Sequence, residues 1–98
     1  MASEHSGVYI IRNTATGCVY VGSASNLAKR WAAHRWLLNR GQHHNHALQA
    51  DWTDSGPLAF DWVCIERSNG NGATADNAEA RWIAHYRLFG SVYNQAAA

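Results

Sequence analysis

The sequence of 98 residues lacks the features that define several classes of protein. It contains no apolar run near the ~18 residues that a membrane-spanning helix needs, and it opens with no signal-peptide pattern. Its two cysteines, Cys18 and Cys64, are too few for a disulfide scaffold, and both lie in strand-like runs, so we expect buried thiols. These absences argue against a membrane protein or a disulfide-rich secreted domain. They predict an intracellular protein, cytoplasmic if bacterial.

Acidic residues are missing from the first half of the chain. No Asp or Glu occurs between His5 and Ala50, a stretch that holds Arg12, Lys29, Arg30, Arg35, Arg40 and five histidines. The second half carries most of the acids, so the net charge of +1 hides an asymmetry. Such segregation predicts a basic face directed at phosphate and an acidic element elsewhere, although chance in a short chain also accounts for it.

Apolar residues are plentiful and predict one packed domain. The hydrophobic fraction is 47% and there are five tryptophans, which fits a folded chain rather than a disordered one. The length suits a single domain, residues 1–98, with a core over residues 7–94.

The order of the expected elements is β-β-α-α-β-α, an α+β arrangement. Strands over residues 7–13 and 18–22 should form a hairpin around the turn 14–17, and residues 58–66 should form a third strand. We expect a three-stranded antiparallel sheet flanked by helices, with the first strand central.

Three helices fill the intervals between and after these strands. The first should begin at a cap on Ser25 or Asn26 and end near Asn39. A short helix should run through Leu48 and Trp52. The last should begin at a capping box formed by Asp76 and Glu79, reach about residue 89 and precede a terminal segment over residues 92–94.

Tyr9 and Tyr20 form the first candidate pair. A hairpin loop of even length places them on the same face of the sheet, directly opposed or diagonal. An odd loop or a bulge would place them on opposite faces, and tyrosine is common in strands without any function.

Arg30 and His34 are four residues apart and therefore share one face of a helix. Trp31 and Leu38 belong to the expected buried stripe, which turns the Arg30 and His34 face away from the deepest core. A guanidinium matches phosphate and an imidazole relays protons, although a solvated helix face is the simpler interpretation.

Glu79 lies at the edge of an apolar stripe on the last helix. A partly desolvated carboxylate there fits a hard oxygen ligand for Mg²⁺. The competing interpretation gives Glu79 only the structural role of a capping-box acid.

Together these residues resemble a known family. Gly7-Val8-Tyr9 and Tyr20-Val21-Gly22 are similar to the paired signature of the GIY-YIG nucleases. The resemblance continues through Asn26-Leu27, Arg30, His34, Asn45, Leu48-Gln49, Glu79 and Asn94, and thus covers residues 7–94. Val8 and Val21 replace isoleucine, and we expect no separate DNA-binding module of the kind that most relatives carry.

The resemblance implies a metal-dependent endonuclease that hydrolyses phosphodiester bonds in DNA with one Mg²⁺ or Mn²⁺ ion. It implies a general base or water-positioning role for Tyr9, nucleophile or phosphate binding by Tyr20, charge neutralisation by Arg30 and proton movement near His34. Glu79 would be the sole protein ligand to the metal, and Asn94 would support the site. A tyrosine base with a pKa near ~10 is poor unless the metal and Arg30 lower that pKa.

The remaining polar and aromatic side chains suggest contacts with DNA. The histidines of residues 43–46 match no common zinc spacing, so we interpret this segment as a polar loop facing DNA. The expected DNA-binding residues are Lys29, Arg35, Arg40, His43 and His44. Four tryptophans fit the core, whereas Trp36 is the one expected to touch a ligand.

Two other functions fit the same sequence. One is a catalytically idle nucleic-acid-binding module, and the other is an oligomerising scaffold that needs a partner domain. Sequence specificity would come from a partner, from self-association, from a missing domain or from loops such as residues 41–46.

Overall fold

The computed structural model describes residues 6–67 and 72–94. Their order is as the sequence predicts: strands β1 (Gly7–Asn13) and β2 (Val19–Ala24), helices α1 (Leu27–Asn39) and α2 (His46–Ser55), strand β3 (Phe60–Arg67) and helix α3 (Gly72–Phe89). A short 3-10 turn, η1 (Pro57–Ala59), precedes β3. The α+β class is therefore confirmed.

The sheet has the order β2-β1-β3, and both pairings are antiparallel, so the first strand is central as expected. Tyr9 pairs with Gly22 and Ile11 pairs with Tyr20. Because side chains alternate along a strand, Tyr9 and Tyr20 lie diagonally on one face. The predicted shared face of the two tyrosines is confirmed.

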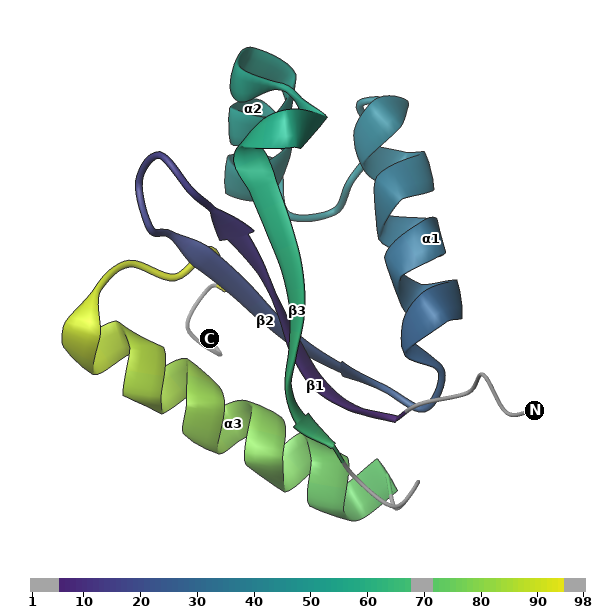
Figure 1. The fold of residues 1–98 in the computed structure, drawn as a ribbon, viewed down its shortest axis with the longest axis vertical. Helices are drawn as coiled ribbons and strands as arrows, with labels where there is room; N and C mark the ends of the chain where they lie inside the picture. The colour runs from purple at the N-terminus through teal and green to yellow at the C-terminus, as the bar shows by residue number, and fades with distance from the viewer. Residues whose placement is uncertain (1–5, 68–71, 95–98) are drawn as a thin grey trace.

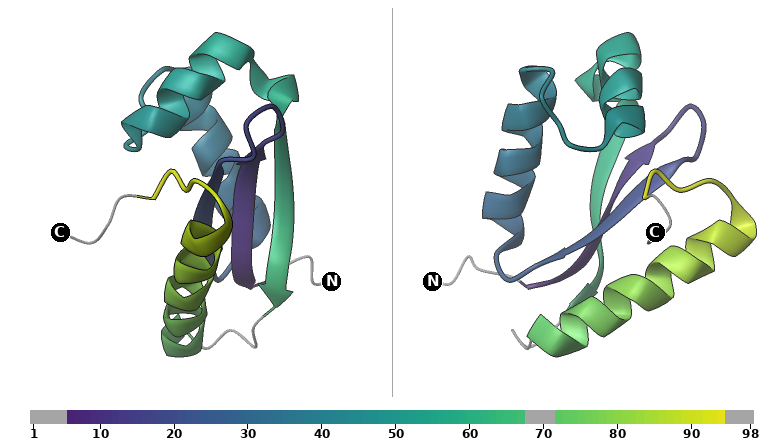
Figure 2. Two further views of the ribbon diagram at one scale, coloured as in Figure 1. Left: turned by 90° about the vertical axis from the view of Figure 1, so that its left-hand side faces the viewer. Right: turned by 180° about the vertical axis from the view of Figure 1, so that it is seen from behind.

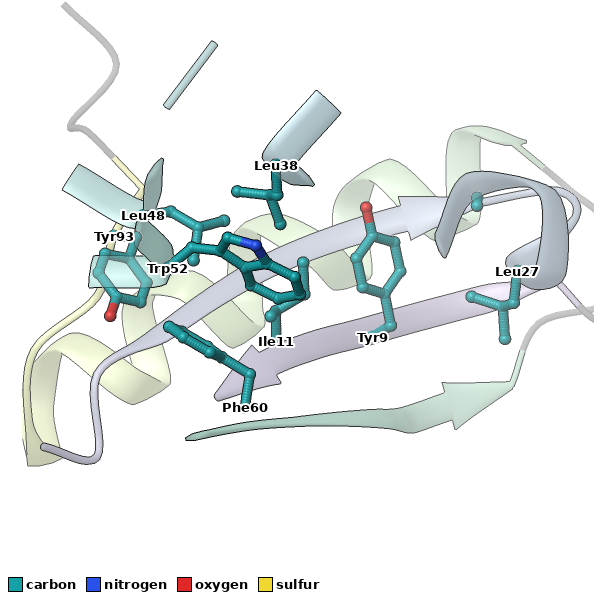
Figure 3. Close-up of a cluster of buried hydrophobic side chains, with 9 residues drawn as sticks. Tyr9, Ile11, Leu27, Leu38, Leu48, Trp52, Phe60 and Tyr93 are labelled. Atoms are coloured by element: carbon teal, nitrogen blue, oxygen red, sulfur yellow. The ribbon is translucent and has the colours of Figure 1, made fainter. Parts of the chain in front are cut away.

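Helices cover both faces of the sheet (Figures 1 and 2). On one face, α1 and α2 pack over a cluster that includes Tyr9, Ile11, Leu38 and Trp52 (Figure 3). On the other face, α3 packs over Val8, Ile10 and their neighbours. Within the described residues, no helix is long and apolar enough to span a membrane.

The segment after α3 lies along the outer edge of β2. Val19 and Val92 form a parallel bridge, with hydrogen bonds from the Val19 amide to the Ser91 carbonyl (3.2 Å) and from the Tyr93 amide to the Val19 carbonyl (2.7 Å). The terminal segment expected over residues 92–94 therefore pairs with the edge strand β2 through a single parallel bridge.

Several local expectations need correction. Helix α3 begins at Gly72, so Asp76 lies within the helix and the capping box predicted for Asp76 and Glu79 is wrong. Strand β3 starts at Phe60 because Pro57–Ala59 forms the 3-10 turn. Cys18 and Cys64 are free thiols and only half-buried, since Cys18 precedes β2 and Cys64 lies on an edge strand.

Candidate active site

The two glycines of the paired signature stand where backbones or rings approach closely. A Cβ on Gly22 would overlap with the hydroxyl end of Tyr9, which crosses over it from β1. A Cβ on Gly7 would overlap with the carbonyl oxygen of Glu66 on β3. The glycines therefore allow Tyr9 to lie flat against β2 and the strands to pair tightly.

The Tyr9 hydroxyl is buried and bonds to the Nε2 atom of His34 at 2.6 Å. Burial raises the pKa of this hydroxyl well above its usual value, and neighbouring Tyr20 raises it further. The Arg30 guanidinium opposes that rise through its charge and a hydrogen bond, so the cation lies beside the phenol.

His34 is buried, which corrects the expectation that its helix face turns away from the core. Arg30, one turn earlier, is exposed as expected. The difference arises because His34 projects between Tyr9 and a second histidine, His43, whose Nε2 atom lies 2.7 Å from the Nδ1 atom of His34. Burial is the main cause that lowers the pKa of His34 to about 3, with His43 and Arg30 adding to it.

His43 is also buried, so the expectation that it faces DNA from a polar loop is wrong. The loop turns inward because the Asn45 amide donates to the Nδ1 atom of His43 at 3.0 Å, and the His43 amide donates to Gln49 at 2.9 Å. Burial lowers the pKa of His43 to about 4. His44 stacks on His43 with a centroid distance of 4.3 Å and remains exposed.

An open cleft of about 450 Å³ spans the β2 edge of the sheet. It is lined by Tyr20, His44, Asn45, His46, Glu79, Ile83 and Asn94. The Tyr20 hydroxyl lies 3.3 Å from the Nε2 atom of His44. Burial raises the pKa of Tyr20, the negative charge of Glu79 raises it further, and Arg30 lowers it.

Glu79 reaches this cleft from α3, on the opposite face of the sheet from Tyr20. Its Oε1 atom accepts a hydrogen bond of 2.6 Å from the Ser23 hydroxyl on β2. Because α3 begins at Gly72, Glu79 lies well inside the helix and has no capping role. The carboxylate is half-buried and borders the cleft.

The residues present fit a divalent ion held mainly by water and substrate. Within the described ranges, no group of three or more His, Cys, Asp or Glu side chains could enclose a metal. Mg²⁺ commonly keeps several waters and takes one or two carboxylates plus phosphate oxygens. A single carboxylate at the border of an open cleft matches that pattern.

Asn94 joins the terminal segment to β2. Its side-chain oxygen accepts from the Val21 amide at 2.7 Å, and its nitrogen donates to the Val21 carbonyl at 2.8 Å. Asn94 therefore fixes the backbone next to Tyr20 and also lines the cleft.

Of the expected DNA-binding Lys and Arg residues, Lys29 and Arg35 lie on α1 and Arg40 is its C-cap. Lys29, Arg35 and Arg40 are exposed. The Arg40 guanidinium lies 4.5 Å from the ring centroid of Trp36, and Trp36 is 58% exposed. The other four tryptophans are buried or half-buried, in line with the packing expected of them.

A second groove, of about 200 Å³, lies beside the N-terminal half of α1. Its lining comprises Ala24, Ser25, Asn26, Lys29, Arg30 and Ala33. Arg30 therefore borders this groove and also lies close to Tyr9 and Tyr20.

Sequence reasoning missed two contributors to the site. Ser23 bonds Glu79 across 56 positions of sequence, and nothing in the local pattern marks that contact. The sequence predicts His43 in an outward-facing loop, whereas its side chain is buried. The signal that could have found it is its closeness to Asn45, which caps α2 through a bond of 3.0 Å to the Leu48 amide.

Comparison with known proteins finds solved structures with the same overall fold. The catalytic domain of the homing endonuclease I-TevI superposes with a TM-score of 0.80 at 29% identity, covering 92% of this chain and 99% of that domain. A point mutant of the catalytic domain of intron endonuclease I-TevI gives the same TM-score and identity, with coverages of 95% and 97%.

A curated relative is similar over part of its length. Intron-associated endonuclease 1 of Enterobacteria phage T4 is 43% identical over 51 residues, which are 52% of this chain and 21% of the relative. The chain thus spans about a fifth of that protein. The model of the GIY-YIG catalytic domain matches residues 5–94, nearly the whole chain. This chain therefore belongs to the GIY-YIG catalytic domain family.

Proposed function

We propose that this chain is an endonuclease that hydrolyses phosphodiester bonds in DNA with one Mg²⁺ or Mn²⁺ ion, and that residues 7–94 form the catalytic unit. The observation that carries the proposal is the convergence of a phenol pair, a guanidinium and a carboxylate at the β2 edge. The positive charge of Arg30 lowers the pKa of both Tyr9 and Tyr20, and the negative charge of Glu79 raises both pKa values from the other face of the sheet. The structural relatives bear the names of homing and intron endonucleases.

Arg30 would neutralise the charge that develops on the phosphoryl oxygens. Its side chain is exposed and borders the smaller groove, so an incoming phosphate can reach it. A guanidinium fork matches two phosphate oxygens, and its charge acts most strongly where water is partly excluded. The buried hydroxyl of Tyr9 lies next to it, so Arg30 stands where the exposed surface meets the buried part of the site.

The two tyrosines would divide the handling of the nucleophile and the phosphate. Tyr9 would accept a proton from the attacking water or orient that water, and Tyr20 would donate a hydrogen bond to the scissile phosphate. Both hydroxyls have raised pKa values in the protein alone, so Tyr9 needs positive charge nearby to act as a base. Arg30 already supplies part of that charge.

Glu79 would hold the metal ion through its carboxylate, with Ser23 fixing one of its oxygens. When bound, the ion supplies positive charge to the phosphate and its leaving oxygen. Asn94 would act indirectly by fixing the Val21 backbone beside Tyr20. His34 would control protons near the nucleophile through its contact with Tyr9.

DNA would lie across the β2 edge and along α1. Lys29, Arg35 and Arg40 present exposed cations there, while His44 borders the cleft. Trp36 adds an exposed ring next to Arg40, a combination suited to nucleic-acid backbones and bases. A partner or self-association would supply sequence specificity.

Incubation of the purified chain with supercoiled plasmid tests the proposal. We expect nicked or linear DNA with Mg²⁺ or Mn²⁺ and intact plasmid with EDTA. DNA binding without cleavage under every metal condition would contradict the proposal and favour the idle binding module. Equal cleavage in EDTA would contradict the metal requirement.

A further inference from the structure

Three side chains and one backbone amide form a continuous hydrogen-bonded chain beneath the site. The Asn45 amide contacts His43 Nδ1 at 3.0 Å, His43 Nε2 contacts His34 Nδ1 at 2.7 Å, and His34 Nε2 contacts the Tyr9 hydroxyl at 2.6 Å. All four residues are buried. Water therefore cannot readily substitute for a missing partner.

We propose that the Asn45 amide sets the direction of this chain, so that His34 donates a hydrogen bond to Tyr9 and His43 is a positioning residue that holds His34 in the required tautomer. The inference rests on the proposed function only for its catalytic consequence. The tautomers themselves are properties of the protein without DNA or metal.

The direction follows from the donor and acceptor capacity of each group. A backbone N–H can only donate, so His43 Nδ1 must accept and carry no proton. A neutral His43 then carries its proton on Nε2 and donates to His34 Nδ1. Neutral His34, in turn, carries its proton on Nε2 and donates to the Tyr9 oxygen.

The reverse direction would leave two donors facing each other. If Tyr9 donated to His34, the proton of His34 would move to Nδ1 and that of His43 to Nδ1, opposite the Asn45 amide. A protonated His43 creates the same clash. The lowered pKa values of both rings agree with neutral forms. A buried unsatisfied donor is costly, so one direction dominates.

The surroundings hold the chain in place. The side chain of Gln49 accepts from the His43 amide at 2.9 Å and donates to the Leu38 carbonyl at 3.0 Å, which ties the loop to α1. The rings of His34 and His43 are stacked with centroids 4.9 Å apart. Neither ring can rotate freely without losing these contacts.

The consequence concerns the role of His34 in the reaction. Because its Nε2 atom already carries a proton, His34 cannot take the proton of Tyr9. It instead directs a donor at the phenolic oxygen, as Arg30 does from the solvent side. Both donors stabilise the phenolate that Tyr9 becomes once its own proton has left to solvent, and this phenolate is the form that can accept a proton from the attacking water.

Nitrogen NMR of the ¹⁵N-labelled protein, without metal or DNA, tests the tautomers directly. Long-range ¹H–¹⁵N correlations distinguish a ring protonated at Nε2 from one protonated at Nδ1, and His34→Gln and His43→Gln spectra assign the signals. We expect Nε2–H forms for both residues near neutral pH. An Nδ1–H form of His34 would overturn the proposal whether or not the protein cleaves DNA.

Two substitutions at His43 then test the catalytic consequence. Glutamine can accept from the Asn45 amide and donate to His34, whereas leucine fills similar space and can do neither. We expect His43→Leu to lower kcat on plasmid by about tenfold or more with little change in KM, and to give His34 mixed tautomers. We expect the loss of kcat in His43→Gln to be far smaller.

The outcomes separate positioning from packing. Equal losses of kcat in the two variants, or His34 keeping its Nε2–H form in His43→Leu, would overturn the positioning role of His43. If His43→Leu fails to fold, two measurements still test the proposal. An Nδ1–H tautomer of His34 in the wild type, or a large loss of kcat in His43→Gln, would contradict it. Absent cleavage by the wild type would contradict the proposed function and leave the NMR result standing.

Discussion

The ring of Tyr9 crosses directly over Gly22, its antiparallel partner on β2, and leaves no space for a side chain there. The paired signature of the sequence is thus a packing relationship. The large ring on one strand requires a residue without a side chain, glycine, on the next strand. The hydroxyl that bonds His34 is positioned by this contact.

Gly22→Ala should therefore disturb both stability and activity. The added Cβ must displace Tyr9 or β2, and overpacking of this kind costs about 1–3 kcal/mol. We expect a Tm lower by several degrees and a larger fractional loss of plasmid cleavage. Gly90→Ala is the control, because a Cβ at Gly90 meets nothing nearby. A wild-type Tm and wild-type cleavage in Gly22→Ala would contradict the packing argument.

Glu79→Gln should abolish metal-dependent cleavage while leaving Tm within a few degrees. The variant keeps the shape of the side chain and can still accept from Ser23, but loses the charge that would hold the metal. Thermal unfolding and plasmid cleavage across a Mg²⁺ titration measure the two effects. Full activity in Glu79→Gln would exclude the ligand role.

Acidification should destabilise the protein through His34 and His43. Their folded pKa values, about 3 and about 4, lie below the usual histidine pKa of 6.5, so the unfolded state binds more protons. The contribution of the two neutral rings to the free energy of unfolding is complete above pH ~6.5. It falls by about 1.4 kcal/mol per pH unit for each histidine as the pH drops toward the folded pKa values. Burial is the main cause for both rings; His43, Arg30 and His44 add to the lowering of the His34 pKa, and His44 adds to that of His43.

Denaturant unfolding between pH 7 and pH 5 measures this slope. The double variant His34→Gln, His43→Gln should show a flatter dependence over the same range. A wild-type stability that does not change over this interval would contradict the buried, neutral state of the two rings.

Trp36→Ala and Arg40→Gln should weaken DNA binding more than they change the cleavage rate at saturating DNA. Arg40→Gln should also reduce the salt slope of binding by about one unit, as expected for one lost phosphate contact. Fluorescence anisotropy with EDTA present measures affinity without cleavage. Arg81→Gln is the control, because Arg81 lies on α3 near Glu66. Equal effects of Arg81→Gln and Arg40→Gln would argue against a DNA surface on α1.

Much of the fold could be predicted from sequence because its signals are local. Runs rich in β-branched and aromatic residues predict β1 and β2, and a hairpin loop of even length places Tyr9 and Tyr20 on one face, as observed. Asn26 was one of two proposed caps, and its side chain accepts from the Lys29 amide at 3.1 Å. Such features depend on neighbours within a few positions.

The missed features depend on distant partners. The burial of His34 requires the loop before α2 to fold inward and bring His43 against it. The position of Glu79 depends on Ser23, which lies on another element. The start of α3 at Gly72 was missed because Asp76 offered a plausible cap four residues later.

The rate of plasmid cleavage at saturating DNA by Arg30→Ala tests the central claim most directly. If Arg30 stabilises the transition state, the rate should fall about a hundredfold or more, corresponding to a loss of about 3 kcal/mol, while DNA affinity changes much less. Arg35→Ala is the matched control, because Arg35 lies on the same helix with its guanidinium 5.0 Å from the Trp62 ring centroid. We expect Arg35→Ala to weaken binding mildly and to leave this rate nearly unchanged. The same modest defect in both variants would contradict a catalytic site centred on Arg30.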